Sequence, residues 1–140
     1  MEGIIKFLLG STEEARTLRE TFVFKIVPML NPDGVIFGHY RCSFLGVDLN
    51  RRWKSPSRYL HPTIFYTKEL LRTLNMEREV VLFCDIHGHS RKKGIFMYGC
   101  QAPGGDLKAH KANSLIKMIP YVFSQTCPTL NFDECKFANE

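Results

Sequence analysis

The chain has 140 residues, of which 44% are apolar and 24% are charged, and its formal net charge is +5. This composition suits one domain with a hydrophobic core and excludes global disorder. No stretch approaches the roughly 18 uninterrupted apolar residues that cross a membrane, and the first nine residues lack the pattern of a signal peptide. We therefore expect a soluble intracellular protein.

Five cysteines are present, an odd number without C-x-x-C spacing. This pattern argues against a disulfide framework and against a cysteine zinc site, so we expect reduced thiols in a cytosolic compartment.

Positive charge is concentrated in two local clusters. They consist of Arg51, Arg52, Lys54 and Arg58, and of Arg91, Lys92 and Lys93. Such clusters attract an acidic partner, either a nucleic acid backbone or an acidic polypeptide, although charge runs are also common on ordinary solvated surface. Because the sequence contains no recognisable nucleic-acid-binding module, we expect no nucleic acid partner.

The first elements predicted are two short helices. Apolar residues fall on one face of residues 1–9, and Gly10 follows as a stop, which predicts a helix there. Residues 11–14 (STEE) fit a capping box, in which the Ser11 hydroxyl and the Glu14 carboxylate satisfy the first donors of a second helix.

A buried strand and a long loop follow the second helix. Residues 22–28 (FVFKIVP) are apolar on both faces, which predicts a strand covered by helices, and residues 31–34 (NPDG) predict a turn after it. Glycines and prolines among polar residues predict an irregular segment over 35–62, and loops of this length are often functional.

The remaining pattern alternates helices and apolar strands. Helices are predicted over 63–76, capped near His61, and over 106–119, capped by Asp106 and stopped by Pro120. Strands are predicted over 79–86 (EVVLFCDI) and 94–99 (GIFMYG). The alternation indicates an α/β domain whose strands are at least partly parallel.

His87 and His89 follow a predicted strand, at the edge where α/β sheets bind ligands. If the strand persists through them, their spacing places both imidazoles on one face, where either or both could bind a divalent metal such as zinc. Alternatively, the two histidines only satisfy hydrogen bonds at the end of a strand. A catalytic zinc takes three protein ligands, and the others are not evident from spacing.

Four residues of the 35–62 loop are suited to recognising a substrate. The Arg51 guanidinium and the Asn50 amide can bind a free carboxylate together, and Arg41 can supply a second cation to a polarised carbonyl oxygen. Asp48 can orient a metal-bound imidazole as a hydrogen-bond acceptor. Taken singly, each is equally typical of a solvated polar loop.

Taken in order, these motifs resemble one family. NPDG, then RCSFLGVDLNRRW and DIHGHSRKKGIFMYG, are similar to the zinc metallocarboxypeptidases, and most closely to their cytosolic carboxypeptidase subfamily of tubulin deglutamylases. The resemblance runs from about Met1 to at least Gly99. It implies an α/β fold with a mixed, mostly parallel sheet flanked by helices, and one catalytic zinc held by two histidines and a glutamate.

The resemblance also implies roles for single residues. His87, in preference to His89, resembles the last of the three zinc ligands, and Asp48 resembles the partner of a zinc histidine. Arg41 resembles the arginine that polarises the scissile carbonyl and stabilises the oxyanion. Asn50 and Arg51 resemble the clamp for the terminal carboxylate, so Arg51 and His87 are expected to meet in one pocket.

The implied reaction is removal of C-terminal or side-chain glutamates from acidic protein tails, those of tubulin above all. The expected location is the cytoplasm, with microtubule association as a finer expectation, and no membrane partner is implied.

The sequence departs from the family at two places. None of its five histidines is followed by a glutamate three residues later, so the H-x-x-E motif of the first two zinc ligands is absent. Neither Glu134 nor Glu140 stands in the context of the catalytic glutamate. We therefore expect residues 1–140 to be the central part of a catalytic domain, truncated at both ends and inactive alone.

Two alternatives stay open. One is a non-catalytic short isoform that binds acidic tails. The other is an aspartoacylase-type zinc amidohydrolase acting on small N-acyl amino acids, against which the stretch RKKGIFMYG counts.

Overall fold

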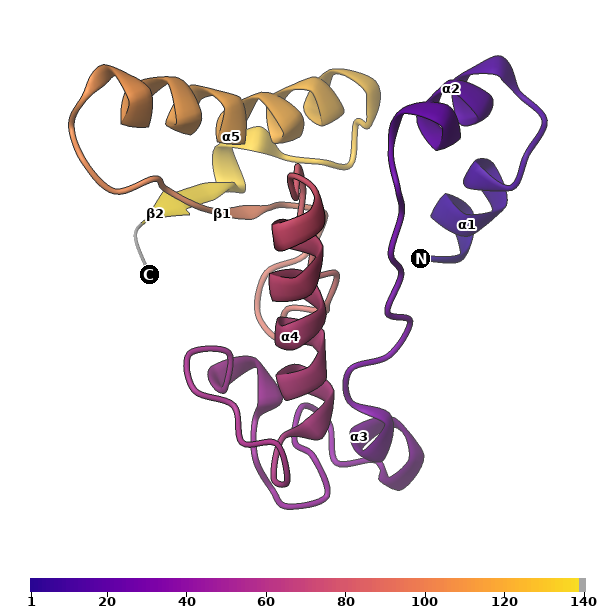
Figure 1. The fold of residues 1–140 in the computed structure, drawn as a ribbon, viewed down its shortest axis with the longest axis vertical. Coiled ribbons are helices and arrows are strands. Elements are labelled where there is room, and N and C mark those ends of the chain that lie inside the picture. The colour runs from indigo at the N-terminus through magenta and orange to yellow at the C-terminus, as the bar shows by residue number, and fades with distance from the viewer. Residues whose placement is uncertain (139–140) are drawn as a thin grey trace. The chain divides into compact units, whose positions relative to one another are not determined.

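The computed structural model describes residues 1–138 of the chain. The chain divides into two compact units, Met1–Ile86 and His87–Glu140, and each is described by itself (Figure 1). Glu140, which the sequence analysis set aside as a catalytic base, lies outside the described residues. Within residues 1–138, no helix is long and apolar enough to cross a bilayer.

The first unit begins with the two predicted helices, α1 (Glu2–Leu8) and α2 (Glu13–Thr21). The two helices contact each other, and Leu8 of α1 and Ala15 of α2 are buried. The predicted cap of α2 is wrong, because Thr12 and not Ser11 accepts a hydrogen bond from the Ala15 amide, at 3.2 Å. Since α2 starts at Glu13, Thr12 is the residue whose hydroxyl reaches the third amide of the helix.

The NPDG sequence starts a helix instead of forming only a turn. Asn31 caps α3 (Pro32–Phe37) by accepting from the Gly34 amide at 3.0 Å, and Pro32 occupies the first helical position, where its fixed φ is favourable. The Asn31 amide group also donates to the Cys42 carbonyl at 3.1 Å. The motif therefore ties α3 to the following loop.

The loop that follows is largely irregular, as predicted. An antiparallel bridge joins Cys42 to Asp48, and a short 3-10 helix, η1, spans Leu49–Arg51. Helix α4 (Pro62–Glu77) then begins after His61, which confirms the predicted helix and its cap region. Ile64 of α4 is the largest fully buried side chain, at 1% exposure.

Two predicted strands are wrong for the described residues, since 22–28 and 79–86 are irregular backbone in the structure. Their side chains are exposed, with Val23 at 55% and Val81 at 67%. A strand is stabilised by pairing its backbone groups with a neighbouring strand, and neither segment has such a neighbour in residues 1–138. An apolar sequence predicts that a segment prefers burial, but it does not show whether a partner strand is present.

The second unit contains a parallel β-α-β arrangement. Strand β1 (Tyr98–Cys100) pairs in parallel with β2 (Lys136–Ala138), and helix α5 (Leu107–Thr126) and the 3-10 helix η2 (Phe132–Glu134) lie between them in the chain (Figure 1). This arrangement confirms the α/β class on a small scale. The third predicted strand, 94–99, is shorter in the structure and starts four residues later, at Tyr98, since Ile95 forms only an isolated bridge with Leu130.

Helix α5 packs closely on β1. A Cβ added at Gly99 would lie 2.8 Å from Ile116 Cγ2 and 2.9 Å from Phe137 Cδ1, so the contact requires glycine there. The predicted cap is confirmed, because Asp106 accepts from the Ala109 amide at 2.8 Å.

The predicted end of this helix is wrong. Pro120 is buried inside α5, which continues to Thr126. A proline inside a helix costs about 3 kcal/mol, because it removes one hydrogen bond and crowds the preceding turn. Packing on both sides of Pro120 offsets this cost, through Ile116 against β1 and through Tyr121 against Phe132.

Candidate functional site

Four of the five predicted site residues lie on one turn of the first unit. The bridge between Cys42 and Asp48 closes this turn, and inside it the Ser43 amide donates to the Val47 carbonyl at 2.9 Å. Arg41 stands just before the bridge, and Asn50 and Arg51 follow it in η1. The structure therefore brings these residues together through local hydrogen bonds.

Asp48 uses both carboxylate oxygens to order this turn. One oxygen accepts from the backbone N–H of Asn50 at 3.0 Å and caps η1, and the other lies 3.3 Å from Arg41 Nε. The Asp48 side chain is only 22% exposed. Because Arg41 is held through Nε, its two terminal nitrogens remain for a further acceptor.

The Asn50 side chain is oriented by Trp53. The indole Nε1 donates to Asn50 Oδ1 at 3.0 Å, so the Asn50 amide nitrogen is the atom left to donate. Trp53 packs edge-on against Phe83, with ring centroids 5.6 Å apart, and its carbonyl accepts from Lys68 Nζ at 2.8 Å. The sequence analysis missed Trp53 and Lys68. The three-residue spacing of Asn50 and Trp53 could have indicated the contact between these two side chains.

Arg51 is exposed at the end of η1. Its guanidinium forms an ion pair with none of the carboxylates in residues 1–138. Together with Arg41 and Asn50 it presents hydrogen-bond donors and two positive charges from one ordered turn. Such a surface suits an anionic or strongly polarised oxygen ligand.

The two candidate metal ligands, His87 and His89, belong to the second unit and are both exposed. His89 Nδ1 accepts from the amides of Arg91 and Lys92, at 3.2 and 3.0 Å, so His89 caps the turn that follows it. Its ring also lies against Phe96, with centroids 5.4 Å apart. These contacts support the hydrogen-bonding interpretation for His89. The choice of His87 as the ligand stays a prediction.

Lys92 and Glu134 form an ion pair in this unit. Lys92 Nζ lies 2.5 Å from a Glu134 carboxylate oxygen and 4.9 Å from the Phe96 ring centroid. The hydrogen bond from Lys92 lowers the pKa of Glu134, and the same bond raises the pKa of Lys92. Glu134 therefore serves as the partner of a lysine, which agrees with its exclusion as a catalytic base.

The donor set for zinc is incomplete in this part of the chain. No group of three or more His, Cys, Asp or Glu side chains in residues 1–138 could hold a metal ion. A catalytic zinc takes three protein ligands. The described residues therefore do not form a complete zinc site by themselves.

Comparison with known proteins identifies the family. Residues 2–129 match the family model of the zinc carboxypeptidases, so the chain belongs to that family. This confirms the resemblance inferred from the motifs.

Relatives with similar sequences are cytosolic carboxypeptidases. The chain is 48% identical over 139 residues to cytosolic carboxypeptidase 3 of Mus musculus and to cytosolic carboxypeptidase 2 of Xenopus tropicalis. It is 47% identical over 149 residues to cytosolic carboxypeptidase 1 of Xenopus laevis. These alignments cover 98%, 98% and 100% of the chain, and only 14%, 14% and 12% of the relatives. The chain thus spans a small part of their length.

Proposed function

We propose that this chain contributes the substrate-recognition part of a zinc carboxypeptidase that removes glutamates from acidic protein tails. Membership of the zinc carboxypeptidase family supports the reaction class, which is hydrolysis of a peptide bond at a carboxyl terminus. The glutamates can stand at the carboxyl terminus or on a side chain. Glutamylated tubulin is the main substrate in this proposal.

The observation that carries this proposal is the ordered donor surface formed by Arg41, Asn50 and Arg51. The Asn50 amide nitrogen is left to donate because its oxygen accepts from Trp53. Arg41 is fixed through Nε by Asp48 and keeps its terminal nitrogens for a substrate. A free carboxylate accepts up to four hydrogen bonds and is recognised best by such charge-assisted donors.

In this proposal each donor has a separate role. Asn50 and Arg51 bind the terminal carboxylate of the substrate and thereby select the last residue of the tail. Arg41 donates to the carbonyl oxygen of the bond to be cleaved, where negative charge develops, and donors already in place stabilise that charge. Asp48 contacts no substrate and holds Arg41 and η1 in position.

His87 is proposed as one zinc ligand. Since residues 1–138 hold no group of three ligands, the proposed site needs at least one further ligand from outside these residues. When zinc is bound, it acts as the Lewis acid in enzymes of this family. The chemistry of this chain's own residues, as described above, is recognition of carboxylate and carbonyl oxygens.

The substrate class and the location rest on charge and on the relatives. Arg51, Arg52 and Lys54 are exposed on the recognition turn, and the formal net charge of the chain is +5, which favours acidic tails. The relatives are named cytosolic carboxypeptidases, and we propose a cytoplasmic location for this chain as well, with microtubule association where tubulin is the substrate.

The clamp can be tested on the chain itself. Calorimetry should be done with a peptide that ends in two glutamates, once with a free carboxyl terminus and once with an amidated one. Arg51→Ala should weaken binding of the free acid by about 10- to 100-fold, because a charge-assisted hydrogen bond contributes about 1.5–3 kcal/mol. Arg16→Ala on α2 removes an equal charge from another place and should leave the affinity unchanged. Equal losses for both variants would contradict the clamp.

The hydrolase can be tested in a chimera. This chain should replace the aligned segment of the Mus musculus relative, and glutamate release and bound zinc should both be measured. We expect activity and one zinc, both lost in His87→Ala and both retained in His110→Ala. A chimera that binds zinc equally well without His87 would contradict the ligand assignment.

A non-catalytic protein that binds acidic tails is the second candidate. The incomplete donor set for zinc in residues 1–138 favours it. Free-acid peptide binding by this chain, combined with a chimera that releases no glutamate, would support it over the hydrolase.

A further inference from the structure

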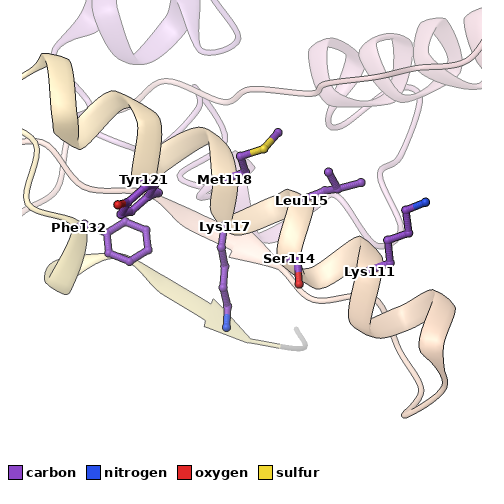
Figure 2. Close-up of a pocket in the computed structure, with 7 residues that line it drawn as sticks. All are labelled: Lys111, Ser114, Leu115, Lys117, Met118, Tyr121 and Phe132. Atoms are coloured by element: carbon purple, nitrogen blue, oxygen red, sulfur yellow. The ribbon is translucent and has the colours of Figure 1, made fainter.

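A second surface of interest lies on helix α5, in the second unit of the chain. An open groove of about 400 Å³ runs along this helix and reaches Phe132 of η2 (Figure 2). Tyr121 and Phe132 stand at one end with ring centroids 5.7 Å apart, and Lys111 stands at the other end. Ser114, Leu115 and Met118 lie between these ends.

The middle of the groove is apolar and uncovered. Leu115, Met118 and Tyr121 are 52%, 51% and 54% exposed. Their spacing of three residues places them along one side of the helix, which is the usual pattern of a packing surface. The opposite side of α5 is already used, because Ile116 packs on Gly99 of β1. The exposed stripe is therefore additional to the contact that holds the helix in its unit.

The charge around this stripe is positive. Lys111 and Lys117 line the groove, and residues 107–126 contain no aspartate or glutamate. Asp133 follows Phe132, and Glu134 beyond it is already paired with Lys92. The residues that line the groove therefore carry two positive charges and no negative one, and Asp106, the cap of α5, precedes them at the Lys111 end.

We propose that this groove is a docking site for an acidic amphipathic segment of a protein partner. The segment places two apolar side chains, one helical turn apart, over Leu115 and Met118, and its carboxylates face Lys111 and Lys117. The stretch from Lys111 to Tyr121 is about 15 Å long, which corresponds to about three turns of a partner helix.

Charge disfavours a second copy of the chain as the occupant, since two copies of α5 would bring lysines against lysines. A membrane surface is also disfavoured. A helix that lies on a bilayer presents an apolar face with no second element beside it, whereas Phe132 of η2 packs against Tyr121 at the edge of this face. An acidic polypeptide satisfies both the charge and the shape.

The test uses the 140-residue chain and a designed acidic helix of about three turns with two leucines four residues apart. Binding is followed by fluorescence anisotropy at low and at physiological salt. The double variant Lys111→Glu, Lys117→Glu should weaken binding at least tenfold, and Met118→Ser should weaken it several-fold. The matched controls are Lys108→Glu on the same helix and the exposed Met76→Ser on α4, and neither should change the affinity.

Three outcomes would overturn the proposal. One is equal binding of a peptide with the same charge and serines in place of both leucines, which would indicate plain charge attraction. Another is tighter binding of anionic vesicles with the same dependence on Lys111 and Met118. The third is self-association of the chain that Met118→Ser abolishes. None of these measurements involves Arg51 or a free carboxyl terminus, so failure here leaves the proposed clamp untouched.

Discussion

Asp48 and Trp53 show how single hydrogen bonds give the recognition turn its chemistry. Asp48 accepts from the backbone N–H of Asn50 and pairs with Arg41, so one carboxylate both caps η1 and holds the Arg41 guanidinium. Trp53 fixes the orientation of the Asn50 amide group, which a sequence leaves undetermined. The resemblance predicted Asp48 as the partner of a zinc histidine. That role stays a prediction, and the ordering of Arg41 and η1 is the role that the structure shows.

Replacing Trp53 by phenylalanine tests this orientation. The change keeps the ring against Phe83 and removes the donor to Asn50 Oδ1. Loss of one neutral hydrogen bond of about 1 kcal/mol should weaken binding of the free-acid peptide about fivefold, with the amidated peptide unaffected. Tyr59→Phe, at a side chain that is 87% exposed, is the control. An unchanged affinity in Trp53→Phe would show that Asn50 does not contact the carboxylate.

The Lys92–Glu134 pair gives a prediction on pH. Its hydrogen bond holds the pKa of Glu134 below the usual value of 4.5. A carboxylate with a depressed folded pKa stabilises the fold above its unfolded pKa, and this stabilisation is lost as the pH falls through the folded pKa. NMR titration of Glu134 should show the depression, and Lys92→Met should return the pKa toward 4.5. An identical titration in both proteins would mean that the pair does not form in solution.

At the scale of elements, the helices follow local sequence closely and the strands do not. The four predicted helices follow apolar spacing and, in α2 and α5, side-chain caps that act within a few residues, at Thr12 and Asp106. The corrections at Ser11 and Pro120 are also local, since the cap moved by one residue to Thr12 and the end of α5 moved from 119 to Thr126. A strand depends on a partner distant in the chain, so 22–28 and 79–86 could not be judged from their own composition.

Gly34 is the position in the NPDG motif where space decides the residue. A Cβ there would lie 2.9 Å from the Cys42 carbonyl oxygen and would also clash with the Asn31 side chain. Gly34→Ala should therefore lower the free energy of unfolding by about 1–3 kcal/mol, the usual cost of overpacking. Gly3→Ala in α1, where nothing lies within 4 Å, should be neutral or slightly stabilising. Urea unfolding followed by Trp53 fluorescence measures both.

At the scale of the whole chain, the two irregular apolar segments are expected to determine how strongly the chain self-associates in solution. Residues 22–28 and 79–86 expose large side chains such as Val23, Phe24, Val81 and Leu82. Exposed apolar segments with unpaired backbone groups promote association. We expect light scattering from the purified chain to rise with concentration, and Val81→Lys to reduce this rise. A monodisperse monomer at all concentrations would contradict the expectation.

The meeting of Arg51 and His87 in one pocket also belongs to this scale and stays a prediction. The two residues lie in different units, and each unit has been described by itself. A short chemical crosslink between cysteines introduced at Arg52 and Ser90 would support it in an active chimera, and failure to crosslink in that active protein would count against it.

The sequence by itself determined the family, the helices and the residues of the recognition turn, because ordered motifs and helix caps depend on neighbours close in the chain. Only the tertiary structure decided which strands pair, where α5 ends, which atom of Asn50 can donate and what His89 binds. The strand pairing and the end of α5 depend on contacts with groups distant in the chain. The contacts of Asn50 and His89 are local, but they depend on side-chain orientations that neither spacing nor composition specifies.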